Sequence, residues 1–135
     1  MGQYAGRQSH EQQVHYLRKT VNYNDAGIAA GVAHNAALPP GAQIIGIFTN
    51  VTVAFNAGTT NSLVVGKTQG GNEIATAADT VCGTAGFKST TTGCAIDPTT
   101  LTADTPVYFA YTQTGAAATQ GRAVITIAYT PPNDQ

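Results

Sequence analysis

Between residues 45 and 130 the apolar side chains recur at every second position in three separate runs. The alternating positions are Ile45, Ile47, Val51, Val53 and Phe55 in the first run, Val107, Phe109 and Tyr111 in the second, and Ile125, Ile127 and Tyr129 in the third. This periodicity is that of a β-strand whose two faces meet different surroundings. Beyond residue 20 no 3.6-residue helical pattern persists, so the sequence predicts strands and no long helix.

Turn-forming residues separate the runs. Leu38-Pro39-Pro40-Gly41 predicts a turn, and a Gly/Asn/Thr cluster at 56–61 predicts a hairpin loop between the first run and a strand at 62–66. Residues 20–23 and 27–32 are weaker strand candidates, and 68–100 holds only isolated apolar residues. Six to eight short strands at this spacing predict an all-β fold, an antiparallel β-sandwich that is jelly-roll-like.

Charged residues are scarce in this sequence. Charged residues make up 10% of the chain, against roughly 25% in an ordinary soluble domain, and Ala (22), Thr (21) and Gly (15) take their place. A small domain normally relies on net charge to stay apart from its neighbours. We therefore expect a surface that other protein covers, which favours a component of an assembly over an enzyme.

The first twenty residues differ from the rest. They carry Arg7, Arg18 and Lys19 against Glu11 alone, so that 1–20 has a net charge of +2 and 21–135 a net charge of -3. We interpret 1–20 as a polar N-terminal arm and 21–135 as the sandwich domain. The arm is either extended or a short helix that begins near Ser9, and it is either a frayed terminus or a segment that becomes ordered on a neighbouring subunit.

Tyrosine and arginine are favoured at protein interfaces, which makes the arm a candidate contact with a partner. The candidate contact residues are Tyr4, Arg7, His10, His15, Tyr16, Arg18 and Lys19.

No residue pattern points to catalysis, a cofactor or a metal site. The carboxylates of Asp97 and Asp104 precede prolines and predict turn starts, and the histidines lack the spacing of metal ligands. The net charge of -1 argues against a nucleic-acid binder. The sequence shows no transmembrane run and no secretory signal, so we expect no membrane association and synthesis in the cytosol.

Two cysteines, Cys82 and Cys94, lie twelve residues apart in a Gly/Thr-rich stretch. A disulfide between them would close a short loop and add about 3 kcal/mol of stability. In the cytosol two reduced thiols are the default. Both alternatives stay open at this point.

Three stretches together resemble the small decoration, or cement, proteins on the heads of tailed bacteriophages. They are VNYNDAGI at 21–28, VAFNAGTTN at 53–61, and LTADTPVY at 101–108 with its continuation to GRAV at 121–124. The resemblance does not include the arm. It implies a β-sandwich on the exterior of the virion capsid, made in the host cytoplasm, that bridges subunits of the major capsid protein and forms a dimer or trimer. The alternative function is a neck, tail or head-fibre component whose β-sandwich binds a glycan or receptor.

Overall fold

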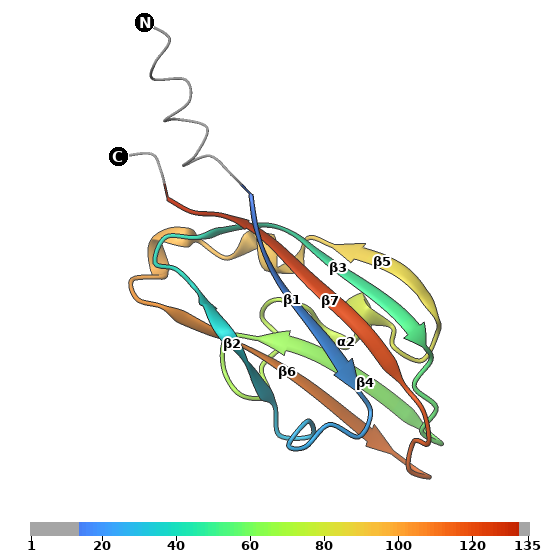
Figure 1. Ribbon diagram of the computed structural model, residues 1–135. Coiled ribbons are helices and arrows are strands. Elements are labelled where there is room, and N and C mark those ends of the chain that lie inside the picture. The colour runs from blue at the N-terminus through green and yellow to red at the C-terminus, as the bar shows by residue number, and fades with distance from the viewer. Residues whose placement is uncertain (1–13, 133–135) are drawn as a thin grey trace, which may run out of the picture.

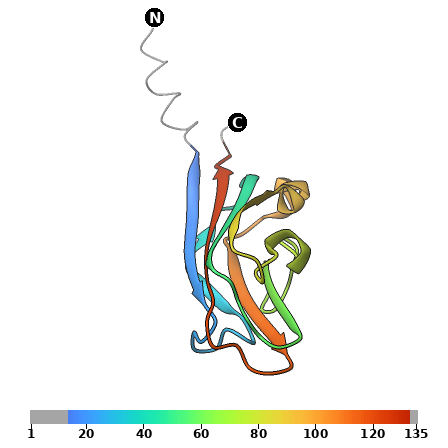
Figure 2. The same ribbon diagram turned by 90° about the vertical axis from the view of Figure 1, so that its right-hand side faces the viewer.

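The computed structural model of the chain describes residues 14–132. Seven strands form two antiparallel sheets that face each other (Figures 1 and 2). The strands are β1 (His15–Asn22), β2 (Val32–Leu38), β3 (Gln43–Val53), β4 (Thr60–Gly66), β5 (Gly86–Thr90), β6 (Thr105–Thr114) and β7 (Arg122–Thr130). The four-stranded sheet has the order β1-β7-β3-β5 and the three-stranded sheet the order β2-β6-β4.

The strand pairs are nested inside one another. The first strand β1 pairs with the last strand β7, β2 pairs with β6, and β3 pairs with β5. Innermost, Val65 of β4 forms a bridge with Ala75, and the chain turns between them at Gly70, where φ is +80°. The chain is therefore one long antiparallel ribbon, and every connection between consecutive strands crosses from one sheet to the other.

Rolling up this ribbon brings β3 against β7 and β4 against β6, which completes the two sheets. A ribbon rolled into two facing sheets is a jelly roll, so the predicted fold class is confirmed. His15 of β1 pairs with Tyr129 of β7, so the beginning of the first strand and the end of the last lie at the same end of the sandwich.

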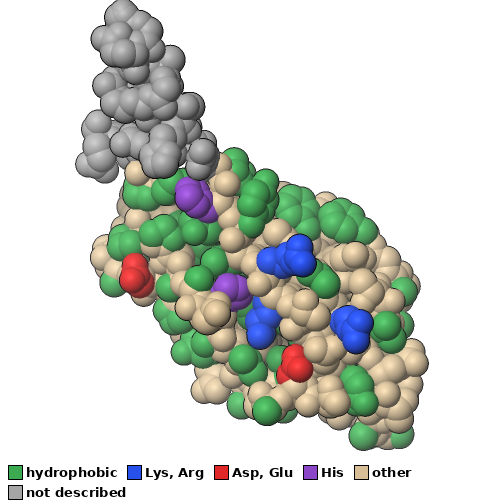
Figure 3. Space-filling view, in the orientation of Figure 1, with side chains coloured by type: hydrophobic (Ala, Val, Ile, Leu, Met, Phe, Trp, Pro, Cys, Tyr) green, Lys and Arg blue, Asp and Glu red, His purple; other side chains and the backbone are tan. Residues whose placement is uncertain are grey.

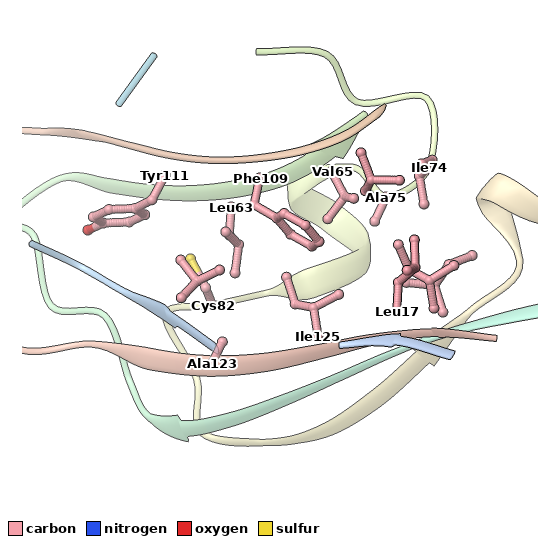
Figure 4. Close-up of a cluster of buried hydrophobic side chains, with 14 of the residues drawn as sticks. Leu17, Leu63, Val65, Ile74, Ala75, Cys82, Phe109, Tyr111, Ala123 and Ile125 are labelled. Carbon is pink, nitrogen blue, oxygen red and sulfur yellow. The ribbon is translucent and has the colours of Figure 1, made fainter. Parts of the chain in front are cut away.

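The core lies between the two sheets (Figure 4). Its fully or almost fully buried side chains include Leu17, Val21, Ile47, Val51, Ile125 and Ile127 from the four-stranded sheet and Leu63, Val65, Val107, Phe109 and Tyr111 from the other. Each large apolar side chain that leaves water here stabilises the fold by roughly 1.5–3 kcal/mol. The faces predicted for the runs at 107–111 and 125–129 are confirmed, because Val107, Phe109, Tyr111, Ile125 and Ile127 all point inward.

Two irregularities in β3 change the face predicted for its ends. The register with β7 shifts between Ile44 and Gly46 and again between Val51 and Val53. Each bulge moves the alternation by one residue. Ile44 is therefore buried in the core, whereas Ile45 and Val53 are 48% and 36% exposed.

A histidine links the two sheets at the side of the sandwich where their edge strands β1 and β2 lie. His34 of β2 donates from Nε2 to the carbonyl oxygen of Arg18 in β1, at 2.9 Å. Its Nδ1 accepts a hydrogen bond from the backbone N–H of Ala36, also at 2.9 Å. The bond to Arg18 occupies one of the carbonyl groups that edge strand β1 would otherwise leave without a partner.

The helical content is small. Helix α2 (Ala77–Thr80) is a single turn closed by a capping box between Thr76 and Asp79, and the 3₁₀ turns η1 (Thr92–Ala95) and η2 (Pro98–Thr100) follow β5. None of the helices in residues 14–132 has the length and apolar character needed to cross a membrane.

The predicted arm boundary at residue 20 is wrong. Residues 15–20 belong to strand β1, which pairs along its whole length with β7. A helix through Leu17 is excluded by the same pairing, because Leu17 is a core residue of that strand. Residues 1–13, the remainder of the predicted arm, lie outside the described residues.

Three further expectations are corrected. Residues 27–30 form turns, and the strand begins only at Val32. The predicted hairpin between the runs at 45–55 and 62–66 does not exist, because β3 and β4 lie in different sheets. The stretch 68–100 contains a strand, β5, that its sequence does not predict.

A pair of phenylalanines provides a matched test of this fold. We expect Phe109→Ala, in the core, to lower the free energy of unfolding by about 3–5 kcal/mol, because it leaves a cavity. We expect Phe87→Ala, whose side chain is 67% exposed, to cost about 1 kcal/mol or less. Urea denaturation followed by circular dichroism measures both. Equal losses would show that Phe87 is buried and that the orientation of β5 is wrong.

Candidate interaction surface

Strand β1 divides the residues predicted to contact a partner between two faces. Tyr16 and Arg18 point outward from the four-stranded sheet and are exposed. His15 and Lys19 alternate with them and lie on the inward side of β1. On that side the ring of His15 stacks on the ring of Tyr129, its neighbour in β7, at 5.7 Å between centroids. The remaining candidates, Tyr4, Arg7 and His10, lie outside the described residues.

The outward-facing residues of the four-stranded sheet line up in rows across its strands, and we call this surface the outer face. One row is Tyr16, Ala128 and Gly46; the next is Arg18, Thr126, Phe48 and Ser89; the third is Thr20, Val124, Asn50 and Phe87. The structure thus brings Tyr16 and Arg18 together with residues of β3 and β5 that sequence reasoning did not select.

Two phenylalanines form an aromatic pair on the outer face. The rings of Phe48 and Phe87 are stacked, with centroids 6.1 Å apart and planes 15° apart. The ring of Phe48 can lie against the sheet because residue 46 is a glycine. A Cβ atom at that position would come within 2.8 Å of the ring. Phe87, on edge strand β5, has little other cover and is the most exposed large apolar side chain among the described residues.

A shallow hollow lies beside this pair. Its volume is about 360 Å³, and its lining residues are Arg18, Phe48, Asn50, Phe87, Val124 and Thr126. All six belong to the outer face, so the hollow has an aromatic side, a polar side and one cationic group.

The charges on the outer face have one sign. Arg18 and Arg122 point outward from β1 and β7, and no outward-facing position of the described strands in this sheet holds a carboxylate. Figure 3 shows this side of the molecule, with basic side chains across its middle, hydrophobic ones toward its upper end, and acidic side chains to the left of and below the basic ones. The face therefore combines exposed apolar area with positive charge.

Four of the carboxylates that the structure describes support turns or loops, those of Asp25, Glu73, Asp79 and Asp97. The side chain of Asp97 accepts a hydrogen bond from the N–H of Thr99, which confirms the turn start predicted there, and Asp79 closes the capping box of α2. The backbone N–H of Lys67 lowers the pKa of Glu73, and the hydroxyl and N–H of Thr99 lower that of Asp97. Within residues 14–132 no three His, Cys, Asp or Glu side chains come together as metal ligands would.

A second hollow, of about 320 Å³, lies at the end of the sandwich where β1 ends and β7 begins. Its lining includes Asn22, Tyr23, Asn24, Gln120 and Arg122. The side chain of Asn22 accepts a hydrogen bond from Nε of Arg122 at 3.2 Å, which orients the guanidinium.

Cys82 and Cys94, the candidates for a disulfide, are free thiols. They are anchored at opposite ends of β3: the carbonyl of Cys82 accepts from the N–H of Phe55, and that of Cys94 accepts from the side chain of Gln43. A strand of this length spans on the order of 30 Å, whereas the Cα atoms of a disulfide lie within about 7 Å. Burial raises the pKa of the Cys82 thiol to about 11 and also raises that of Cys94.

No model of a known protein family matches the sequence, and no curated protein does either. Solved structures, however, share the fold. A chain in the cyanophage Pam1 capsid asymmetric unit has a TM-score of 0.67 and 22% identity, over 90% of this chain and 87% of that one. The fold is that of chains found in phage capsids.

Two further structures agree. A chain in the capsid of Ralstonia phage GP4 has a TM-score of 0.60 and 20% identity, over 90% of this chain and 86% of that one. A chain in the acidic stable capsid structure of Helicobacter pylori bacteriophage KHP30 has a TM-score of 0.59 and 20% identity, over 91% of each. All three matching chains are therefore close to this one in length.

The two thiols should differ in reactivity. At pH 8 a thiol with a pKa of about 11 is ionised in only about one molecule in a thousand, and Cys82 is also almost fully buried. We expect a thiol-specific reagent to label Cys94 in the native protein and Cys82 only after unfolding in urea. The variants Cys82→Ser and Cys94→Ser assign the two phases. Two thiols that stay unlabelled in urea until a reductant is added would instead demonstrate a disulfide.

Proposed function

We propose that this protein is a structural component of a phage head, a decoration or cement protein that binds the outside of the capsid and bridges subunits of the major capsid protein. The observation that carries the proposal is the match of nearly the whole fold to chains of similar length in three phage capsid structures. The resemblance in sequence at 21–28, 53–61 and 101–124 supports it independently.

The outer face supplies the attachment surface in this proposal. Aromatic residues and arginine are enriched at the centres of protein interfaces, and the outer face presents Tyr16, Arg18 and Phe87 together. The scarcity of charge elsewhere removes a barrier to close packing with neighbours. His15 and Lys19 lie on the same strand but point away from this face, and Tyr4, Arg7 and His10 stay predicted contacts within residues 1–13.

The mechanism is mechanical. Packed DNA pushes the capsid outward, and a subunit that spans a junction between capsid subunits adds buried area that must be exposed before the junction opens. A standard interface buries about 1,600 Å² in total, which is enough for specific attachment. Self-association into a dimer or trimer would multiply the attachment points, so that each contact need not be tight.

The second candidate function is glycan or receptor binding by a neck, tail or head-fibre component. The observation that favours it is the hollow at the end of the sandwich, where Tyr23 lies with Asn22, Asn24 and an oriented Arg122. Amide and guanidinium groups beside an aromatic ring suit hydroxyl-rich ligands. A glycan array that gives reproducible binding, lost in Asn24→Ala, would support this function.

The decoration function predicts both stoichiometry and stability. Purified protein added to phage heads that lack it should bind in a copy number on the scale of the major capsid protein, because a cement subunit occupies every equivalent junction. Quantitative mass spectrometry of the particles measures the ratio, and calorimetry should show a higher temperature of head disruption after binding. A copy number confined to one vertex, or no gain in thermal stability, would contradict the proposal.

The contribution of residues 1–13 can be separated from that of the sandwich. A chain that begins at Val14 keeps β1 whole, whereas a cut at residue 20 would remove most of that strand. We expect the chain from Val14 to fold with unchanged circular dichroism and to bind heads more weakly than the full chain. Equal affinity of the shortened and the full chain would show that the sandwich alone attaches to the head.

A further inference from the structure

The hollow on the outer face leaves apolar area that none of the described residues, 14–132, covers. An exposed phenylalanine on an edge strand keeps apolar area in water, which the hydrophobic effect disfavours. Phe87 nevertheless sits at this position, stacked on Phe48, with the floor of the hollow formed by Val124. At about 360 Å³, the hollow is at the small end of the range for ligand pockets and suits one or two side chains rather than a larger molecule.

The charge beside the aromatic pair narrows the choice of partner. Arg18 lines the hollow, with Asn50 and Thr126 as its polar neighbours, and no outward-facing carboxylate of the described strands in this sheet is available to pair with it. A guanidinium offers a planar fork of donors that matches a carboxylate in two parallel hydrogen bonds. The group that complements this end of the hollow is therefore an Asp or Glu side chain.

We propose that the hollow binds a segment of a neighbouring capsid subunit that carries a large apolar side chain close to a carboxylate. The apolar side chain packs against Phe48, Phe87 and Val124, and the carboxylate pairs with Arg18. The proposal rests on the proposed decoration function, because it names the chemistry of the capsid partner at the same surface.

The outer face of a second copy does not offer the acidic group that complements this hollow. In a symmetric dimer through the outer face, the same patch meets itself. The charged groups of this patch on the described strands are Arg18 and Arg122, so a second copy would bring further positive charge and no carboxylate to pair with Arg18. The charge of the face selects an acidic partner over self-association at this site.

Matched pairs of variants test the two halves of the hollow. We expect Phe87→Ala and Arg18→Glu each to weaken binding to phage heads by about 30-fold or more, as removal of a central interface residue does. Val81→Ala removes an exposed apolar side chain away from this face, and Lys67→Glu makes the same reversal of charge away from it. Both controls should bind like the unaltered chain, and all four should keep its circular dichroism.

Photo-crosslinking then identifies the partner directly. A benzophenone side chain replaces Phe87, the protein is bound to heads, and the crosslinked peptides are sequenced. We expect a capsid-protein peptide with an Asp or Glu next to a large apolar residue, and we expect a Lys at that acidic position to restore binding of Arg18→Glu.

Each failure has its own meaning. If the unaltered chain does not bind heads, the decoration function fails and this proposal fails with it. If the unaltered chain binds but Phe87→Ala and Arg18→Glu bind equally well, only this proposal is overturned. Crosslinks to a second copy of this chain, or to a capsid segment without a carboxylate, overturn it as well.

Discussion

The pairing of the first strand with the last is the interaction on which the rest of the structure depends. It closes the nested ribbon, and it places β7 between β1 and β3 at the centre of the four-stranded sheet. Only then do the inward side chains of both sheets meet in one core. The outer face follows from the same pairing, because its rows are the outward positions of strands that the ribbon has set side by side.

Sequence reasoning succeeds here where one face of a strand is buried and the other is not. The alternation in β6 and β7 is uninterrupted, so both strands and their faces are predicted correctly. It gives the wrong face where a bulge shifts the alternation of inward and outward residues, as at Ile45. It misses a strand that carries few apolar residues, as in β5. It also cannot assign partners: β3 and β4 follow one another as a hairpin would, yet the rolled ribbon places them in different sheets.

Of the residues predicted to contact a partner, Tyr16 and Arg18 lie on the outer face, and their contact with a partner stays a prediction. Tyr16 and Arg18 stand out because their segment is polar and basic, although it is a strand and not a free arm. Phe48, Asn50 and Phe87 were missed because nothing local shows that β3 and β5 lie next to each other. One signal was available: Phe48 is a large apolar residue at an outward position of β3, two residues from a glycine over which its ring lies.

The nested topology also sets the order in which the protein reaches its native state. Strand β1 is made before the other described strands, but its sheet partner among them is β7, a hundred or more residues later. Contacts between such distant parts of a chain form slowly, on millisecond to second timescales in all-β domains. Until then the apolar edges of the half-made sheets are open to other copies. The sandwich can therefore close only after β7 has been made, and the outer face is completed at that step.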